Sequence, residues 1–280
     1  MIKVTIRYFV VVCLLLAGCR KDSIDNIIPE QSDLLDLKYG SHSAQSVDVY
    51  LPENRNSQTK AIIFIHGGFW FGGDKAEMSS MAKQFRDKGY ATASVNYRLT
   101  GTAENNIHPA QVSDLGKAIE FIQTKAAEWK ISANEVALVG ASAGGHLALL
   151  YTYAYNTSGD VKTVVSLAGP TNLMNMPNAS VQQKLVVRWF LGDVAENIPS
   201  VYEQASPISH VSSASKPTLL LHGKLDVIVP YEQSLELKTK LDQFGVKNKL
   251  VTYENLGHDV KFDEVPGLLT ECENWLAENL

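Results

Sequence analysis

The chain has 280 residues, a formal net charge of −5 and 45% hydrophobic residues. This length fits one globular domain behind a short leader, and the hydrophobic content is enough to build a sizeable core. No run of basic residues follows Lys21, and the net charge is negative, so nucleic acid is excluded as an expected partner.

Residues 1–18 have the pattern of a signal peptide. Lys3 and Arg7 precede the uncharged apolar run 9–16, which is shorter than the roughly 20 residues of a membrane span. The tetrapeptide Leu-Ala-Gly-Cys that ends at Cys19 resembles the lipobox of bacterial lipoproteins. The resemblance implies that Cys19 carries lipid and that the protein is held at the membrane of the bacterial cell envelope, on its periplasmic or outer side. A plain secretory signal and an uncleaved anchor are the alternatives.

Residues 19–33 are polar and are predicted to tether the anchor to one catalytic domain at 34–280. Cleavage before Cys19 would remove two basic residues and no acidic ones, so the formal charge would change from −5 to −7. Cys13 leaves with the signal peptide and Cys19 is the lipid site. Cys272 is therefore expected to be unpaired and to pack in a C-terminal helix.

Two early strands are predicted at 35–39 and 46–51, the second with one half-buried face because apolar and polar residues alternate in it. From residue 60 onward, strand and helix patterns alternate. Strands are predicted at 60–65, 90–95, 136–139, 161–167, 218–221 and 249–253, and helices at 76–88, 111–126, 232–244 and 265–280. Such alternation predicts an α/β fold with a mostly parallel central sheet and helices on both faces. In such sheets the site lies beyond the carboxyl ends of the strands.

Residues 171–212 interrupt this alternation as a small insertion. They include a short helical pattern through Leu185, Val186, Trp189 and Phe190. These large apolar side chains are expected either to cover a substrate cleft or to form an ordinary extra helix on the core.

The pentapeptide from Gly140 to Gly144, Gly-Ala-Ser-Ala-Gly, lies between an apolar strand and a helical pattern. A serine at the top of such a sharp turn has its hydroxyl exposed, and the flanking glycines avoid collisions across the turn. Ser142 is therefore the candidate nucleophile. Taken alone, the five residues are equally compatible with an ordinary turn.

A serine nucleophile needs a base and a carboxylate that orients the base. Asp226 and His258 each lie in a loop after a predicted strand. Alone, each would be an ordinary surface residue. Together, the order Ser142, Asp226, His258 is the chain order expected for a catalytic triad on an α/β-hydrolase sheet.

The turn that begins at His66, His-Gly-Gly-Phe-Trp, follows another buried strand. Its consecutive glycines let backbone N–H groups point inward, and with the N–H of Ala143 they can hold an oxyanion. The alternative is a glycine turn without a role. His66 itself is expected to brace the loop rather than to titrate in catalysis.

Five motifs together resemble the α/β-hydrolase esterases related to hormone-sensitive lipase. They are His66-Gly-Gly-Phe-Trp70, Asn96-Tyr-Arg-Leu99, Gly140-Ala-Ser-Ala-Gly-Gly-His146, His222-Gly-Lys-Leu-Asp226 and Gly257-His258. The chain is most similar to the small bacterial branch with feruloyl-esterase-like and acetyl-xylan-esterase-like enzymes. The resemblance implies that Gly68 and Phe69 donate to the oxyanion, and Trp70 is expected to line the substrate site. The short polar segment before residue 34 leaves no room for the larger N-terminal cap of longer relatives, which argues against a long-chain lipase.

The expected activity is ester hydrolysis through an acyl-enzyme, without metal or cofactor. The expected substrate is a small-molecule or polysaccharide-linked ester with acetyl or feruloyl groups. Exopeptidase or arylformamidase-like amidase activity on the same fold is an alternative. A non-catalytic binding protein is another, although no triad member is missing.

Overall fold

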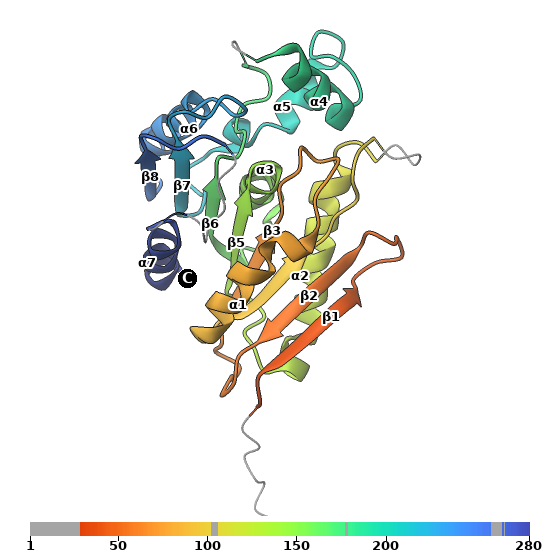
Figure 1. The fold of residues 1–280 in the computed structure, drawn as a ribbon, viewed down its shortest axis with the longest axis vertical. Helices are drawn as coiled ribbons and strands as arrows, with labels where there is room; N and C mark the ends of the chain where they lie inside the picture. The colour runs from red at the N-terminus through yellow and green to blue at the C-terminus, as the bar shows by residue number, and fades with distance from the viewer. Residues whose placement is uncertain (1–28, 102–105, 177–178, 259–264, 266) are drawn as a thin grey trace, which may run out of the picture.

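The computed structural model of the chain describes residues 29–101, 106–176, 179–258, 265 and 267–280. The predicted signal peptide and Cys19 lie outside these residues. One eight-stranded sheet forms the centre, in the order β1-β2-β4-β3-β5-β6-β7-β8 (Figure 1). The strands are β1 (Ser32–Lys38), β2 (Ser46–Leu51), β3 (Ala61–Ile65), β4 (Ala91–Val95), β5 (Val136–Ala141), β6 (Val161–Leu167), β7 (Thr218–Gly223) and β8 (Asn248–Tyr253).

Strands β3 to β8 are parallel to one another, whereas β2 is antiparallel to both of its neighbours. The larger helices are α1 (Ser79–Asp87), α2 (Ala110–Trp129), α3 (Ala143–Leu150), α4 (Val181–Leu191), α6 (Glu232–Gln243) and α7 (Leu268–Asn279). The short helical elements are the 3-10 helices η1 (Lys75–Met78) and η3 (Pro207–His210), the π-helical turn η2 (Tyr151–Tyr155) and α5 (Pro199–Gln204).

Two hydrophobic clusters cover the two faces of the sheet. Side chains from α1 and α7 pack on one face, and side chains from α2, α3 and α6 pack on the other. The expected layering of helices on both faces of a mostly parallel sheet is therefore confirmed, and it buries the apolar strands on both sides. Among the described residues, no helix is both long and apolar enough to cross a membrane.

The burial of β2 differs from the prediction of one half-buried face, because all six of its residues are buried. Tyr50 packs in the cluster beneath α1, with the Lys83 ammonium 5.4 Å from its ring centre. Asp48 forms an ion pair of 2.8 Å with Lys75 of η1. The prediction was wrong because η1 and α1 cover the face on which the alternating polar side chains point.

Some element boundaries also differ from the prediction. Strand β1 begins at Ser32, three residues before the start of the strand predicted at 35–39, because Ser32 and Asp33 already pair with β2. The helix expected at 76–88 is divided into η1 and α1. The last helix begins at Leu268, after Gly267 with φ 95°.

The insertion at 171–212 forms α4, α5 and η3, and α4 and α5 lie at the end of the molecule farthest from β1 (Figure 1). Ser180 and Gln183 form a reciprocal capping box at the start of α4, and Gly192 ends the helix with φ 102°. The Phe190 ring of α4 is fully buried and stacks on Trp70 with 4.3 Å between ring centroids. Helix α4 is therefore fixed directly onto the turn that follows β3.

Candidate active site

Ser142 lies at the sharp turn between β5 and α3, with φ 50° and ψ −120°. A Cβ on Gly144 would lie 2.1 Å from the Ile65 carbonyl oxygen, and one on Gly140 would lie 2.3 Å from the Gly144 carbonyl oxygen. Both positions therefore require glycine. The Ser142 N–H donates to the Leu167 carbonyl at 2.8 Å, which fixes the turn against β6.

The structure brings Ser142, His258 and Asp226 together at the carboxyl ends of β5, β8 and β7. His258 Nε2 lies 2.9 Å from Ser142 Oγ, and His258 Nδ1 lies 2.7 Å from Asp226 Oδ2. Because the carboxylate only accepts, Nδ1 carries a proton, and Nε2 is left to accept the proton of the serine hydroxyl. This arrangement can generate a serine nucleophile.

The Asp226 carboxylate is buried and accepts several hydrogen bonds. Its Oδ1 accepts the N–H groups of Ile228 and Val229, each at 2.8 Å, and its Oδ2 lies 3.2 Å from His222 Nε2. Burial opposes ionisation, but the hydrogen bonds from His222 and His258 outweigh it and hold the pKa of Asp226 well below its usual range. The carboxylate is therefore charged at neutral pH.

His222 contacts the Asp226 carboxylate through its ring nitrogen Nε2, and the sequence did not predict this role. Its Nε2 faces both Asp226 Oδ2 and, at 2.9 Å, the Val229 carbonyl oxygen. Two acceptors at one ring nitrogen require that nitrogen to carry a proton. Its Nδ1 lies 2.7 Å from Ser234 Oγ, so the hydroxyl donates to it in the neutral tautomer. The spacing of four residues between His222 and Asp226 was the one available sequence signal.

The turn after β3 has three consecutive residues with left-handed backbone conformation: Gly68 at φ 98°, Phe69 at 55° and Trp70 at 62°. Such angles cost a non-glycine residue on the order of 1–3 kcal/mol and are typical of functional sites. The N–H groups of Gly68, Phe69 and Ala143 have no hydrogen-bond acceptor among the described residues. They are therefore available to a ligand beside Ser142.

A small apolar pocket lies against Ser142, with a cavity volume of about 30 Å³. It is lined by the turn after β3 (residues 66–73, called the oxyanion turn after its predicted role), the start of α3, the insertion and the loop after β7. The lining residues are Phe69, Trp70, Ser142, Ala143, Pro170, Met176, Gln183, Val186, Val187, Ile228 and Val229. Trp70 lines the wall but is only 3% exposed. Of the four apolar residues named in the prediction for 171–212, Val186 lines this pocket, whereas Phe190 is buried in the core. Helix α4 therefore forms one wall of the pocket and also packs as an extra helix on the core, so each of the two predictions is partly right.

The family model described as BD-FAE matches residues 47–241. The chain belongs to the BD-FAE family. It is 25% identical over 252 residues to a probable isoprenylcysteine alpha-carbonyl methylesterase from Arabidopsis thaliana, which covers 82% of this chain and 52% of the relative. It is 27% identical over 252 residues to esterase LipC from Mycobacterium tuberculosis, and the match covers 83% of this chain and 60% of LipC. The chain therefore spans only about half to three fifths of the length of these relatives.

Solved structures also resemble this BD-FAE chain. A truncated carbohydrate esterase from gut microbiota superposes with a TM-score of 0.78 and 26% identity, over 88% of this chain and 95% of the other. A Thermogutta terrifontis esterase in a propionate-bound form superposes with a TM-score of 0.72 and 21% identity, over 89% of this chain and 94% of the esterase chain. The α/β-hydrolase fold and the relationship to α/β-hydrolase esterases are thereby confirmed.

The Asn96-Tyr-Arg-Leu motif of this BD-FAE chain packs against the oxyanion turn through Tyr97. The Tyr97 hydroxyl lies 3.0 Å from the His66 carbonyl oxygen, and its ring stacks on His66 with 4.4 Å between centroids. Burial lowers the pKa of His66, so the imidazole is neutral and its Nδ1–H donates to the Gly67 carbonyl at 2.8 Å. His66 therefore braces the turn.

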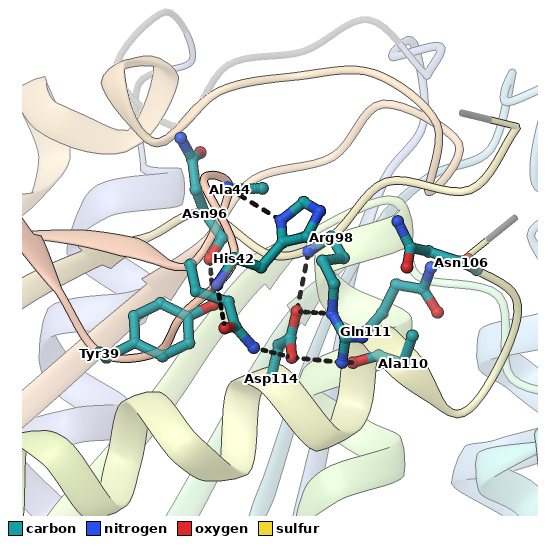
Figure 2. A network of polar contacts seen from close by, with 10 residues as sticks. Tyr39, His42, Ala44, Asn96, Arg98, Asn106, Ala110, Gln111 and Asp114 are labelled. Atoms are coloured by element: carbon teal, nitrogen blue, oxygen red, sulfur yellow. Dashed lines mark hydrogen bonds and ion pairs between the residues drawn. The ribbon is translucent and has the colours of Figure 1, made fainter. Parts of the chain in front are cut away.

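Arg98 anchors the same motif to α2 through the fully buried Asp114 (Figure 2). Asp114 Oδ2 accepts from the Arg98 N–H at 3.0 Å and Nε at 2.8 Å, and Oδ1 accepts from Arg98 Nη2 at 2.7 Å. Gln45 Nε2 adds a further donor at 2.6 Å. A buried carboxylate with this many donors is a rigid anchor. No cluster of three or more His, Cys, Asp or Glu side chains suited to a metal ion occurs in the described part of the chain.

Proposed function

We propose that the protein hydrolyses carboxylic esters with Ser142 as nucleophile, His258 as general base and Asp226 as the orienting carboxylate. The observation that carries this proposal is the continuous hydrogen-bonded path from Ser142 Oγ through His258 to Asp226, with distances of 2.9 and 2.7 Å. It lies beside a pocket and three N–H groups that have no acceptor in the described residues. These are the parts that acyl transfer requires.

In the first half of the reaction, Ser142 Oγ attacks the ester carbonyl carbon and its proton moves to His258 Nε2. The negative oxygen of the tetrahedral intermediate accepts hydrogen bonds from the N–H groups of Gly68, Phe69 and Ala143. Asp226 stabilises the imidazolium, which then protonates the leaving alkoxide. Water attacks the acyl-enzyme by the same proton path and releases the acid.

The acyl group of the substrate is proposed to be short. The pocket beside Ser142 is small, with a volume of about 30 Å³, and its lining is mainly apolar. These features favour a short acyl group such as acetyl over the bulkier feruloyl group. Similarity to a carbohydrate esterase supports a polysaccharide or oligosaccharide as the alcohol.

The protein is further proposed to be lipid-anchored through Cys19 at the bacterial cell envelope. The described chain begins beside β1, at the end of the molecule opposite to α4 (Figure 1). A tether attached there would leave the pocket facing away from the membrane, toward external polymers. Incorporation of an alkyne-labelled fatty acid into the wild type, and its loss in Cys19→Ala, tests this assignment.

The test of the proposed function is turnover of p-nitrophenyl acetate together with labelling by a fluorophosphonate. The wild type should turn over and be labelled, and Ser142→Ala should lose both. Ser113→Ala, an exposed serine on α2, is the matched control and should retain both. Asp226→Asn should lower kcat by about 10³–10⁴-fold because His258 would lose its orienting acceptor. Labelling that persists in Ser142→Ala would overturn the assignment, and turnover of amino-acid anilides but not esters would favour the amidase alternative.

A further inference from the structure

A second, larger groove lies next to the catalytic pocket, with a volume of about 610 Å³. It is lined by Phe71, Gly101, Ile107, Arg188, Trp189 and Gly192. Phe71 is 45% exposed and Trp189 is 48% exposed. Two large aromatic rings this exposed beside a catalytic centre mark a binding surface.

The groove is continuous with the pocket through a row of aromatic rings. Phe69 lines the pocket against Ser142, and its ring centroid lies 6.3 Å from that of Phe71. The Phe71 ring in turn meets the Trp189 ring edge to face, with 6.2 Å between centroids. Helix α4 contributes to both sites. Val186 and Val187 line the pocket, and Arg188 and Trp189 line the groove.

The exposed rings of the groove stand on a firmly held backbone. The Thr100 hydroxyl donates to the Trp189 carbonyl at 2.8 Å, and the His108 N–H donates to the Phe190 carbonyl at 2.8 Å. The Phe71 N–H donates to the Gly68 carbonyl at 3.1 Å within the oxyanion turn. The backbone that carries the two rings is therefore fixed, and a ligand does not have to order it on binding.

The groove also offers polar donors. The Arg188 side chain is half exposed and its Nε lies 3.8 Å from Asp193 Oδ1, which is too far for a hydrogen bond. Aromatic faces next to a guanidinium match a pyranose ring, which has an apolar C–H face and a rim of hydroxyl acceptors.

We infer that the Phe71–Trp189 groove binds a sugar ring of the alcohol part of the ester. This inference rests on the proposed function. The small pocket takes the acyl group on one side of the scissile bond, so the alcohol must extend to another side of Ser142. The aromatic row connects that position with the groove. The substrate class is therefore an acylated oligosaccharide, whose ring next to the ester stacks on Phe71 or Trp189.

The first experiment measures selectivity, as kcat/KM for an acetylated xylo-oligosaccharide divided by kcat/KM for p-nitrophenyl acetate. Trp189→Ala and Phe71→Ala should each lower this ratio by about tenfold or more, mainly through KM for the sugar ester. Trp189→Phe should retain most of the ratio because an aromatic face remains. Phe244→Ala is the matched control, since Phe244 is an aromatic residue exposed by 43% at the end of α6; it should leave both activities unchanged.

The second experiment measures binding without catalysis. The Ser142→Ala protein should bind unacetylated xylo-oligosaccharide in calorimetry, and Ser142→Ala with Trp189→Ala should bind it at least tenfold more weakly. A wild type inactive on every ester would overturn the proposed function, whereas this binding measurement would still report on the groove. Three outcomes would overturn the sugar assignment and leave the esterase intact. The first is an unchanged selectivity ratio in Trp189→Ala and Phe71→Ala. The second is sugar binding that survives the loss of Trp189, and the third is a loss of activity in these two variants that is greater for methyl ferulate than for methyl acetate.

Discussion

The indole N–H of Trp70 donates a hydrogen bond of 3.2 Å to Nδ1 of His146, and so joins the oxyanion turn to the helix that follows Ser142. The other ring nitrogen, Nε2, donates to the Ala205 carbonyl at 2.7 Å, at the end of α5. His146 is fully buried, and burial lowers its pKa to about 3. One neutral imidazole therefore connects the oxyanion turn, α3 and the insertion.

Replacing His146 by leucine is expected to destabilise the protein and to slow catalysis. The Trp70 N–H and the Ala205 carbonyl would each lose a buried partner, at about 1–3 kcal/mol per group. The free energy of unfolding in urea should fall by about 2–6 kcal/mol, and kcat should fall because the oxyanion turn loosens. A double-mutant cycle with Trp70→Phe should give a coupling energy of about 1 kcal/mol. Strict additivity of the two changes would contradict this account.

Stability is expected to decrease as the pH falls below about 6.5. Burial lowers the pKa of His146 to about 3 and that of His108 to about 4, below the ordinary 6.5 of histidine. Between the lowered pKa values and 6.5, the unfolded chain binds more protons than the folded protein. The contribution of these two neutral histidines to the free energy of unfolding is therefore complete above pH 6.5 and is lost as the pH approaches 3. Asp226 adds a loss in the same direction only below about pH 3.8, because its pKa is also lowered.

Urea unfolding at pH 7.5, 5.5 and 4.5 measures this dependence. The wild type should show a steadily lower free energy of unfolding, and His146→Leu should show a shallower slope over the same range. Equal slopes in the two proteins would show that His146 does not titrate on unfolding.

The glycine at position 144 is expected to be indispensable to the fold. A Cβ there would lie 2.1 Å from the Ile65 carbonyl and 2.4 Å from the His66 carbonyl, and both are backbone atoms of the neighbouring segment. Gly144→Ala should therefore destabilise the protein by more than about 2 kcal/mol and abolish activity. Gly116→Ala is the control within α2, where the nearest atom is the Tyr151 ring edge at 3.3 Å. It should change stability by less than about 1 kcal/mol, and comparable losses in the two variants would refute the packing argument.

Gln183 is expected to fix α4 to the loop that carries Asp226. Its Nε2 donates to the Val227 carbonyl at 2.9 Å and to the Ile228 carbonyl at 2.6 Å. Gln183→Ala should lower stability by about 1–2 kcal/mol and raise KM for short esters, because one wall of the pocket loosens. Gln182→Ala removes an exposed glutamine from the same helix and should be neutral within about 0.5 kcal/mol. If KM stays constant in Gln183→Ala, the contact is structural only.

Much of the fold could be predicted because its signals are local. Short apolar runs such as 61–65 and 161–167 are typical of strands buried on both faces, and their alternation with amphipathic helices predicts parallel pairing. The half-buried face expected for β2 was wrong for a nonlocal reason. The polar side chain of Asp48 is buried because Lys75, 27 positions further along, neutralises it.

For the candidate site, the three residues of the triad could be predicted from the sequence, but several residues that contact the site could not. Ser142, Asp226 and His258 could be selected because parallel strands bring their carboxyl ends to one edge, and each residue follows such a strand. The contributions of His222, His146 and Gln183 could not be predicted. Each depends on a hydrogen bond to a backbone carbonyl or side chain whose position is set by packing.

The sequence by itself therefore determined the order of strands and helices, the sharp turn at Ser142 and the chemical types of the candidate catalytic groups. These follow from hydrophobic periodicity and from the conformational demands on glycine, which act over a few neighbouring residues. Only the tertiary structure decided the 2.9 and 2.7 Å contacts of His258, the wall that α4 contributes to the pocket and the exposure of Trp189 next to Phe71. Those features arise where segments far apart in the chain meet, and their geometry depends on how the side chains between them fill space.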